Sequence, residues 1–422
     1  MNRSQLQQHY ETVAANMARA RAYGIAHQAT EDESLNGRHV TLGGRELLNF
    51  GSCSYLGLEH HPALKSGAIE ATGRYGTQFS SSRAYVSLGL YEELEAQLEG
   101  LFGGKVVVTP TTSLGHLAAL PVLIGEQDAL VLDHQVHASV SMAAQLLKAR
   151  GNRVEVIRHN HLGMLENRLQ KLADSHARIW YLADGLYSMY GDLAPLTELH
   201  QLLDQYEQLH LYLDDAHGIG WTGKYGAGTA APLLAGHPRA VIAASLNKSF
   251  AAAGGALILP DQATKQRVRD CGGPLIFSGP IQPPMLGAAL ASARLHLTAE
   301  VADRQAYLLR LIHLFNREAV AYDLPVFTTE ASPICFVRVG KPDVGYNMAR
   351  RLNQLGCYVN LAAYPSVPYK NTGLRMTLHH HLKPQDVMNL VRHIAQELPV
   401  ALEEEQSSLQ DIRRAFGLSQ AS

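Results

Sequence analysis

Residues 211–218 (LYLDDAHG) and 240–255 (AVIAASLNKSFAAAGG) are the segments from which the architecture of this chain follows most directly. Each begins with a short apolar run and then reaches polar or titratable residues. Short continuous apolar runs are typical of parallel strands that are covered on both faces. In an open α/β sheet, ligands bind outside the carboxyl ends of the strands. We therefore expect Asp214, His217 and Lys248 to lie close together at that edge.

The same alternation of apolar runs and helical spacing continues over most of the chain. A helix is predicted before residue 103, because Leu90, Leu94, Leu98 and Leu101 recur at spacings of four and three. Gly103-Gly104 ends this helix. Further strands are predicted at residues 105–110, 129–134, 153–160, 179–185 and 255–260, the last as a strand that turns back. Helices are predicted near residues 113–123, 138–149, 163–174 and 196–207. The predicted fold class is α/β, with a mostly parallel sheet flanked by helices.

The length of 422 residues favours two domains. A long helical stretch at residues 283–319 leads into a region with fewer strands and more helix, which we interpret as a smaller α+β domain. The predicted divisions are an N-terminal arm (1–47), a large domain (48–290), a small C-terminal domain (291–400) and a charged tail (401–422) that forms an exposed helix.

The composition excludes several classes of function. The 36 basic and 38 acidic residues nearly cancel, without a basic block, so nucleic acid is not an expected partner. The four cysteines are widely spaced, so neither a metal site nor a disulfide framework is predicted. The polar N-terminus lacks an apolar signal core, and no apolar run reaches membrane-spanning length. We therefore expect a cytoplasmic protein without a membrane span.

Lys248 and Asp214 suggest the chemistry of the site. An amine can form a Schiff base with an aldehyde, and a carboxylate can pair with a protonated pyridine nitrogen. These two groups at one sheet edge predict pyridoxal 5'-phosphate as the cofactor. The alternatives are a surface lysine and a structural aspartate that accepts backbone hydrogen bonds. Small apolar residues on both sides of Lys248 argue against a solvated lysine.

Other polar residues also follow predicted strands. The segment TTSLG (111–115) lies between a strand and a helix, where free N–H groups favour an anion such as phosphate, although ordinary N-capping is the better explanation of this segment by itself. His137 could stack on an aromatic ring or be an ordinary packed histidine. Asp184 and Ser188 lie in a turn rich in polar residues, which is a weak signal by itself.

The order of these motifs resembles the α-oxoamine synthases, a family of pyridoxal phosphate enzymes with the fold-type I architecture. The resemblance extends over residues 48–378. It is carried by the segments SCSYLGL (52–58), SSR (81–83), HAS (137–139), YSMYGDLAPL (187–196), LDDAHGIG (213–220), SLNK (245–248) and LRMTL (374–378).

The resemblance implies a role for each matching residue. Lys248 would form the Schiff base and move the Cα proton, Asp214 would pair with the ring nitrogen, and His137 would stack on the ring. His217 would bind the phenolic oxygen of the ring. The implied cofactor-binding residues also include Ser113, Leu114, Gly115, Ser245 and, from the neighbouring subunit of a homodimer, Ser278. Asp184 and Ser188 are predicted to join them from their place after a strand. Arg375 would bind the substrate carboxylate, with Ser82, Arg83 and Cys53 around the substrate.

This sequence departs from the family pattern around the substrate and the phosphate. Cys53 replaces an asparagine, residues 80–83 (SSSR) replace a more glycine-rich segment, and Leu114 replaces an aromatic residue. Asn247 and Ser245 also differ from the commoner choices around the lysine. None of these departures removes a reacting group. They favour a divergent branch with an unusual acyl donor.

The predicted function is amino acid C-acyl transfer. A small α-amino acid would condense with an acyl thioester, carried on coenzyme A or an acyl carrier protein, and lose CO2 to give an α-aminoketone. The alternatives are an aminotransferase, a C–C lyase of the glycine C-acetyltransferase type and a non-catalytic partner subunit of a synthase. Retention of Lys248, Asp214, His137 and His217 argues against the last of these.

Overall fold

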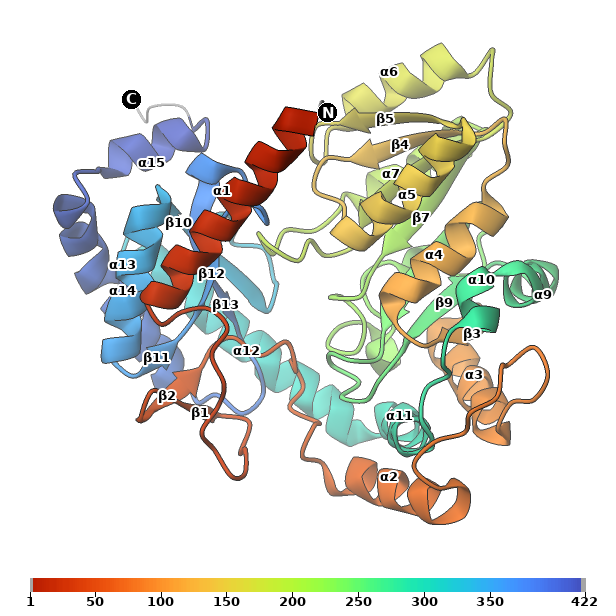
Figure 1. Ribbon diagram of the computed structural model, residues 1–422, viewed down its shortest axis with the longest axis horizontal. Coiled ribbons are helices and arrows are strands. Elements are labelled where there is room, and N and C mark those ends of the chain that lie inside the picture. The colour runs from red at the N-terminus through yellow and green to blue at the C-terminus, as the bar shows by residue number, and fades with distance from the viewer. Residues whose placement is uncertain (1–2, 419–422) are drawn as a thin grey trace. The chain divides into compact units, whose positions relative to one another are not determined.

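The computed structural model describes residues 3–418 (Figure 1), which form two compact units. The large unit comprises residues 56–188 and 193–306. The small unit comprises the described parts of residues 1–55, 189–192 and 307–422. The N-terminal segment thus shares a unit with the C-terminal part of the chain. The domain boundaries expected at residues 47, 290 and 400 stay a prediction.

The large unit is built on a seven-stranded sheet in the order β3-β9-β8-β7-β6-β4-β5. Its strands are β3 (Lys105–Thr109), β4 (Ala129–Asp133), β5 (Arg153–Ile157), β6 (Ile179–Asp184), β7 (Leu209–Asp214), β8 (Ala240–Ser245) and β9 (Gly255–Leu259). Strand β9 is antiparallel to both β3 and β8, whereas the neighbouring pairs from β8 to β5 are parallel. The prediction of a mostly parallel sheet with a strand that turns back is confirmed.

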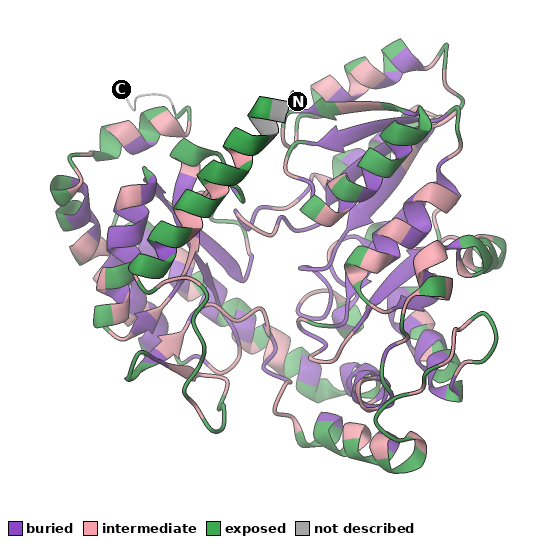
Figure 2. Ribbon diagram, in the orientation of Figure 1, coloured by how far each residue is buried: buried purple, intermediate pink, exposed green. Residues whose placement is uncertain are grey.

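Helices cover both faces of this sheet (Figure 1). The helices of the large unit are α2 (Pro62–Tyr75), α3 (Gly89–Phe102), α4 (Thr112–Leu123), α5 (Ala138–Arg150), α6 (Leu162–Leu172), α7 (Leu196–Gln205), α8 (Ala231–Leu234), α9 (Gln262–Cys271), α10 (Gly273–Phe277) and α11 (Pro283–His296), with the 3-10 turn η1 (Lys224–Gly226). Figure 2 shows that most strands between them are almost entirely buried, whereas the edge strand β5 is more exposed.

Alternate residues of each strand enter two separate hydrophobic cores. On β7, Leu211 and Leu213 join a core with residues of α3, α6, α7 and α11, whereas Tyr212 joins a core with residues of α4 and α5. Side chains in a strand alternate between faces with a period of two. Asp214 therefore lies on the same face of the sheet as Tyr212, the face covered by α4 and α5.

The small unit contains two three-stranded sheets, in the orders β10-β13-β12 and β1-β2-β11. Its strands are β1 (His39–Leu42), β2 (Arg45–Asn49), β10 (Ile334–Gly340), β11 (Cys357–Tyr358), β12 (Asn360–Ala362) and β13 (Thr372–Thr377). Its helices are α1 (Arg3–Ala22), α13 (Pro342–Gln354), α14 (Pro384–Glu404) and α15 (Leu409–Ala415), with the 3-10 turn η2 (Tyr369–Asn371). The boundary between the units falls within α12 (Ala299–Ala321).

Two helical predictions need correction. The stretch predicted as continuous over 283–319 is broken between α11 and α12, where the Thr298 hydroxyl donates to the carbonyl of Leu295. The predicted exposed tail contains the end of α14 and the separate helix α15, and its residues Leu402 and Ile412 are buried. Burial of these apolar side chains holds the segment against the small unit. Residues 419–422 of the predicted tail lie outside the described residues.

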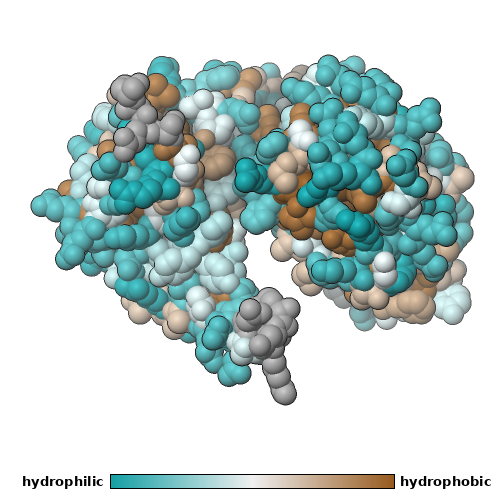
Figure 3. All heavy atoms as spheres, turned by 90° about the horizontal axis from the view of Figure 1, so that it is seen from above, coloured by the Kyte–Doolittle hydropathy of each residue, from teal (hydrophilic) through white to brown (hydrophobic). Residues whose placement is uncertain are grey.

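The visible face of each unit is mainly hydrophilic (Figure 3). Within residues 3–418, no helix combines the length and the apolar character that crossing a membrane requires.

Candidate active site

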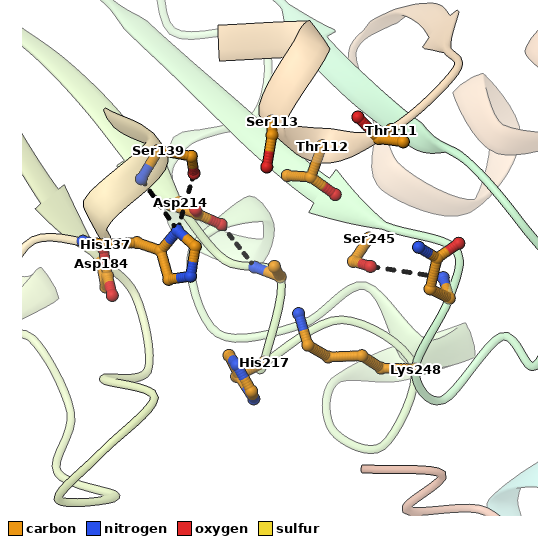
Figure 4. Close-up of a pocket in the computed structure, with 12 residues that line it drawn as sticks. Thr111, Thr112, Ser113, His137, Ser139, Asp184, Asp214, His217, Ser245 and Lys248 are labelled. Atoms are coloured by element: carbon orange, nitrogen blue, oxygen red, sulfur yellow. Dashed lines mark hydrogen bonds between the residues drawn. The ribbon is translucent and has the colours of Figure 1, made fainter. Parts of the chain in front are cut away.

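A cavity lies in the large unit at the carboxyl ends of β6, β7 and β8 (Figure 4). The N-termini of α4 and α5 complete its wall. Its lining residues are Thr111, Thr112, Ser113, His137, Ser139, Asp184, Asp214, Ala216, His217, Ser245, Asn247 and Lys248. The predicted meeting of Asp214, His217 and Lys248 at this edge of the sheet is therefore present in the structure.

The register of the parallel strands explains why these residues meet. Asp184 on β6 pairs with Asp214 on β7, and Asp214 pairs with Ala243 on β8. The three strands therefore end at the same level. Strand β8 ends at Ser245, and the following loop brings Lys248 back over the opening. In Figure 4 the Lys248 side chain extends into the cavity close to His217.

Asp214 is buried, and its contacts favour the ionised carboxylate. Its Oδ1 accepts a hydrogen bond from the Ala216 amide (3.0 Å), and its Oδ2 lies 3.0 Å from Nε2 of His116. Burial acts to raise the pKa of Asp214, but the charge and hydrogen bond of His116, with smaller contributions from His137 and Lys248, hold that pKa well below its usual value. A buried carboxylate of this kind suits a cationic ligand group.

The pKa of Asp184 shifts in the opposite direction. Burial, together with the negative charge of Asp214, raises the pKa of Asp184 well above its usual value. Its Oδ1 accepts a hydrogen bond from the backbone amide of His137 (2.9 Å). Two neighbouring buried carboxyl groups are thus driven toward different protonation states, a pattern that is frequent in active sites.

His137 serves as the N-cap of α5. Its Nδ1 lies 2.6 Å from the Ser139 hydroxyl and accepts from the Ser139 amide, so the orientation of the ring is fixed. Burial lowers the pKa of His137, which favours the neutral ring. Figure 4 shows the imidazole projecting into the cavity, where it can stack on a flat ligand.

The N-terminus of α4 provides a place for an anion. Thr111 is the N-cap and accepts a hydrogen bond from the Leu114 amide, so the N-capping considered in the sequence analysis is present. The neighbouring residues Thr112 and Ser113 nevertheless line the cavity. Gly255 is required here, because a Cβ at this position would lie 2.6 Å from the Thr112 nitrogen. Hydroxyl groups and helix N-terminal amides together favour a phosphate.

The two aspartates of the LDDAHG segment have different tasks. Asp215 points away from the cavity and accepts hydrogen bonds from the amides of Thr229 (2.7 Å) and Ala230 (3.0 Å). The Thr229 hydroxyl also donates to it (2.6 Å). Gly218 packs so closely on this carboxylate that a Cβ there would overlap it. Asp215 therefore holds the loop that carries His217.

Several predicted site residues do not line the cavity. Leu114, Gly115 and Ser188 lie close in sequence to lining residues but do not line the cavity themselves. The Ser82 hydroxyl donates to the carbonyl of Ile276 (2.7 Å). Arg83 forms an ion pair with Glu95 (3.0 Å) and lies over the Tyr91 ring. The Ser278 hydroxyl donates to the Pro274 carbonyl (2.5 Å). The roles predicted for these residues stay predictions.

Arg375 and Cys53 lie together in the small unit. The Arg375 guanidinium on β13 is 3.8 Å from the Cys53 sulfur. Tyr55 interacts with both side chains, and burial raises the pKa of its hydroxyl well above the usual value.

Sequence reasoning missed four residues of the site. Ser139, Ala216 and Asn247 line the cavity, and their positions beside predicted residues could have identified them. His116 does not line the cavity but contacts Asp214 from behind. No sequence motif marks His116, because its contact depends on how α4 packs across β7.

Comparison with known proteins agrees with this geometry. The family model "Aminotransferase class I and II" matches residues 45–394. An 8-amino-7-oxononanoate synthase of Herminiimonas arsenicoxydans is 31% identical over 376 residues, which cover 87% of this chain and 94% of that protein. A serine palmitoyltransferase of Bacteriovorax stolpii is 29% identical over 363 residues, covering 85% of this chain and 84% of that protein.

Solved structures agree on the fold. A serine palmitoyltransferase of Sphingomonas wittichii superposes with a TM-score of 0.83 at 22% identity, covering 95% of this chain and 98% of the other. A serine palmitoyltransferase variant of S. paucimobilis, solved with a pyridoxal phosphate–myriocin aldimine, gives a TM-score of 0.84 at 22% identity, covering 93% and 98%.

The chain belongs to the class I and II aminotransferase family, whose model matches most of its length. Within that family it is one of the α-oxoamine synthases, as the similarity to 8-amino-7-oxononanoate synthases over nearly their whole length indicates. The predicted family, the predicted fold-type I architecture and the predicted cofactor class are thereby confirmed.

Proposed function

We propose that this protein is a pyridoxal phosphate-dependent amino acid C-acyltransferase. It joins a small α-amino acid to the acyl group of a thioester, carried on coenzyme A or an acyl carrier protein, and CO2 is lost to give an α-aminoketone. The observation that carries the proposal is the convergence of Lys248, Asp214 and His137 on one cavity above the N-terminus of α4. The related synthases support the class of reaction.

The cavity fits pyridoxal phosphate in three separate ways. The buried carboxylate of Asp214 matches a pyridinium nitrogen, and His137 offers a flat neutral ring for stacking. Thr112 and Ser113, at the start of α4, match the phosphate group. When bound, the cofactor supplies an aldehyde that condenses with amines and a ring that withdraws electrons from the substrate Cα.

The residues of this chain then have distinct tasks. The Lys248 amine holds the cofactor and afterwards removes and returns the proton at Cα. Asp214 keeps its negative charge beside the ring nitrogen and so stabilises the cationic ring. His217 donates to the phenolic oxygen of the ring, and Ser245 adds a hydroxyl near the phosphate.

Arg375 is proposed to bind the carboxylate of the amino acid. Its planar guanidinium presents paired N–H donors that match a carboxylate in a bidentate geometry. Cys53, beside it, replaces the asparagine of the family pattern and makes this region a source of substrate preference. Cys53, Ser82 and Arg83 stay proposed neighbours of the substrate.

Arg375→Leu is expected to raise KM for the amino acid about 10- to 100-fold, because hydrogen bonds to a charged carboxylate are lost. KM for the acyl thioester should change little, and Arg375→Lys should give an intermediate KM because it keeps the charge without the paired donors. Steady-state kinetics with each substrate varied in turn measures both effects. An unchanged KM for the amino acid in the leucine variant would exclude this role.

A homodimer is also proposed, with Ser278 reaching the phosphate of the neighbouring subunit. Phe277, next to Ser278, is 87% exposed, and Tyr85 is 86% exposed on a loop that Ser82 links to Ile276. Large apolar side chains gathered at one exposed place favour burial against a partner. The similarity to the α-oxoamine synthases supports the same arrangement.

Phe277→Asp is expected to shift the protein from dimer to monomer at micromolar concentration, since a charge would be buried in an apolar contact. Sedimentation velocity measures the change. Val320→Asp is the matched control, because Val320 is also an exposed apolar residue but lies on α12 in the small unit. If Phe277→Asp remains a dimer, the proposed contact is wrong.

The alternatives predict different products. An aminotransferase would convert the bound cofactor to its amine form with the amino acid alone. A C–C lyase of the glycine C-acetyltransferase type would cleave an aminoketo acid when coenzyme A is added. A non-catalytic subunit would do neither, although the site retains Lys248, Asp214, His137 and His217.

The function is tested by incubating the purified protein with pyridoxal phosphate, a panel of small amino acids and a panel of acyl thioesters. We expect CO2 and free thiol to appear in equal amounts and only when both substrates are present. Carrier-bound and coenzyme A thioesters of matched chain length separate the two kinds of donor. Failure of the whole panel to release either product would overturn the proposed reaction.

A further inference from the structure

His116 forms a fully buried polar chain behind the cavity. Its Nε2 lies 3.0 Å from Oδ2 of Asp214, and its Nδ1 lies 2.8 Å from the Tyr212 hydroxyl. All three side chains are within the large unit and have at most 5% exposure. Burial of three polar groups is costly unless each finds a partner, and this chain provides one for each.

The contacts follow from the geometry of two elements. Tyr212 and Asp214 are two residues apart on β7, so their side chains lie on the same face of the sheet. Helix α4 covers that face, and His116 lies one turn inside its N-terminus, where it reaches both side chains. The same helix therefore presents Ser113 to the cavity and His116 to the back of Asp214.

In the neutral tautomer of His116, the Tyr212 hydroxyl donates to Nδ1 and Nε2–H donates to the Asp214 carboxylate. A protonated ring would donate from both nitrogens, so Nε2–H is the donor to Asp214 in either form. The Asp214 Oδ1 already accepts the Ala216 amide. The carboxylate is therefore held on two sides by protein donors, and its remaining lone pairs are left for a ligand in the cavity.

We propose that His116 is a positioning residue that fixes the plane and the charge of Asp214 for the pyridinium nitrogen, and that Tyr212 fixes the tautomer of His116. The inference rests on the proposed function, because it concerns how this site holds its cofactor. Burial shows why a donor is needed, because removing the Asp214 carboxylate from water opposes its ionisation.

The test compares pyridoxal phosphate with its analogue in which a CH group replaces the ring nitrogen. His116→Leu should weaken binding of pyridoxal phosphate about tenfold or more, because a hydrogen bond to a buried charge is lost. It should weaken binding of the analogue far less, since the analogue has no N–H for Asp214. His116→Gln, whose amide can still donate to Asp214, should recover most of the affinity for pyridoxal phosphate that the leucine variant loses. Absorbance titration of the apoprotein measures all the dissociation constants.

A purely structural role predicts another result. Leucine at this position would then weaken both ligands equally, or lower the melting temperature of the apoprotein without changing either affinity, and either outcome would overturn the inference. If the leucine variant does not fold, Tyr212→Phe replaces it: a selective loss of several-fold for pyridoxal phosphate is expected, and equal binding of both ligands contradicts the inference. Lack of cofactor binding by the unmodified protein would instead refute the proposed function.

Discussion

Lys248→Ala is expected to lower the rate of CO2 and thiol release by about 10³-fold or more, because one amine both holds the cofactor and moves the Cα proton. The protein should still fold, since Lys248 lines the cavity rather than the hydrophobic cores. Single-turnover release of labelled CO2 from the amino acid measures the loss.

Two controls make this result specific. Lys248→Arg keeps a positive charge but lacks a nucleophilic amine, so it should be as inactive as the alanine variant. Lys105→Ala removes a lysine of the same unit that pairs with Glu99 (3.0 Å), and it should retain activity within a few-fold. Substantial activity in Lys248→Arg would mean that the charge, and not the covalent chemistry, is what the site needs.

Asp214→Asn is expected to lower kcat about 10²- to 10³-fold and to weaken cofactor binding. The amide cannot neutralise a cationic ring, and loss of one partner of a buried ion pair costs about 3–5 kcal/mol. The absorbance spectrum of the bound cofactor and steady-state rates measure the two effects.

Asp215→Asn is the matched control, because it changes the neighbouring buried carboxylate. Asp215 accepts hydrogen bonds from Thr229 and Ala230 and faces away from the cavity. Its replacement should lower the free energy of unfolding by about 1–2 kcal/mol and change kcat by only a few-fold. If the two variants lost activity equally, the separation of tasks within LDDAHG would be wrong.

The fold could be predicted because most of its strands are apolar runs that end in polar residues. The runs at 129–134, 179–185 and 209–215 became β4, β6 and β7, and the return strand became β9. The break at Leu297-Thr298 was not predictable, because the apolar spacing continues across it. Ile412 is buried because α15 contacts β10, a strand that lies far from it in the sequence.

The centre of the site could be predicted for the same reason. Lys248, Asp214 and Asp184 follow strands that end side by side, so a parallel sheet brings them together. The ion pair between Arg83 and Glu95 on α3 was not expected, because sequence spacing does not reveal such a pair. His116 was missed because only the packing of α4 on β7 joins it to Asp214.

Borohydride reduction of the protein with pyridoxal phosphate, followed by peptide mass mapping, tests the central claim most directly. Reduction fixes a cofactor that is attached to an amine, and the modified peptide identifies that amine. We predict one pyridoxyl group per chain, on the peptide that contains Lys248 and absent from Lys248→Ala. Labelling of a different lysine, or no labelling of the unmodified protein at saturating cofactor, would contradict the account.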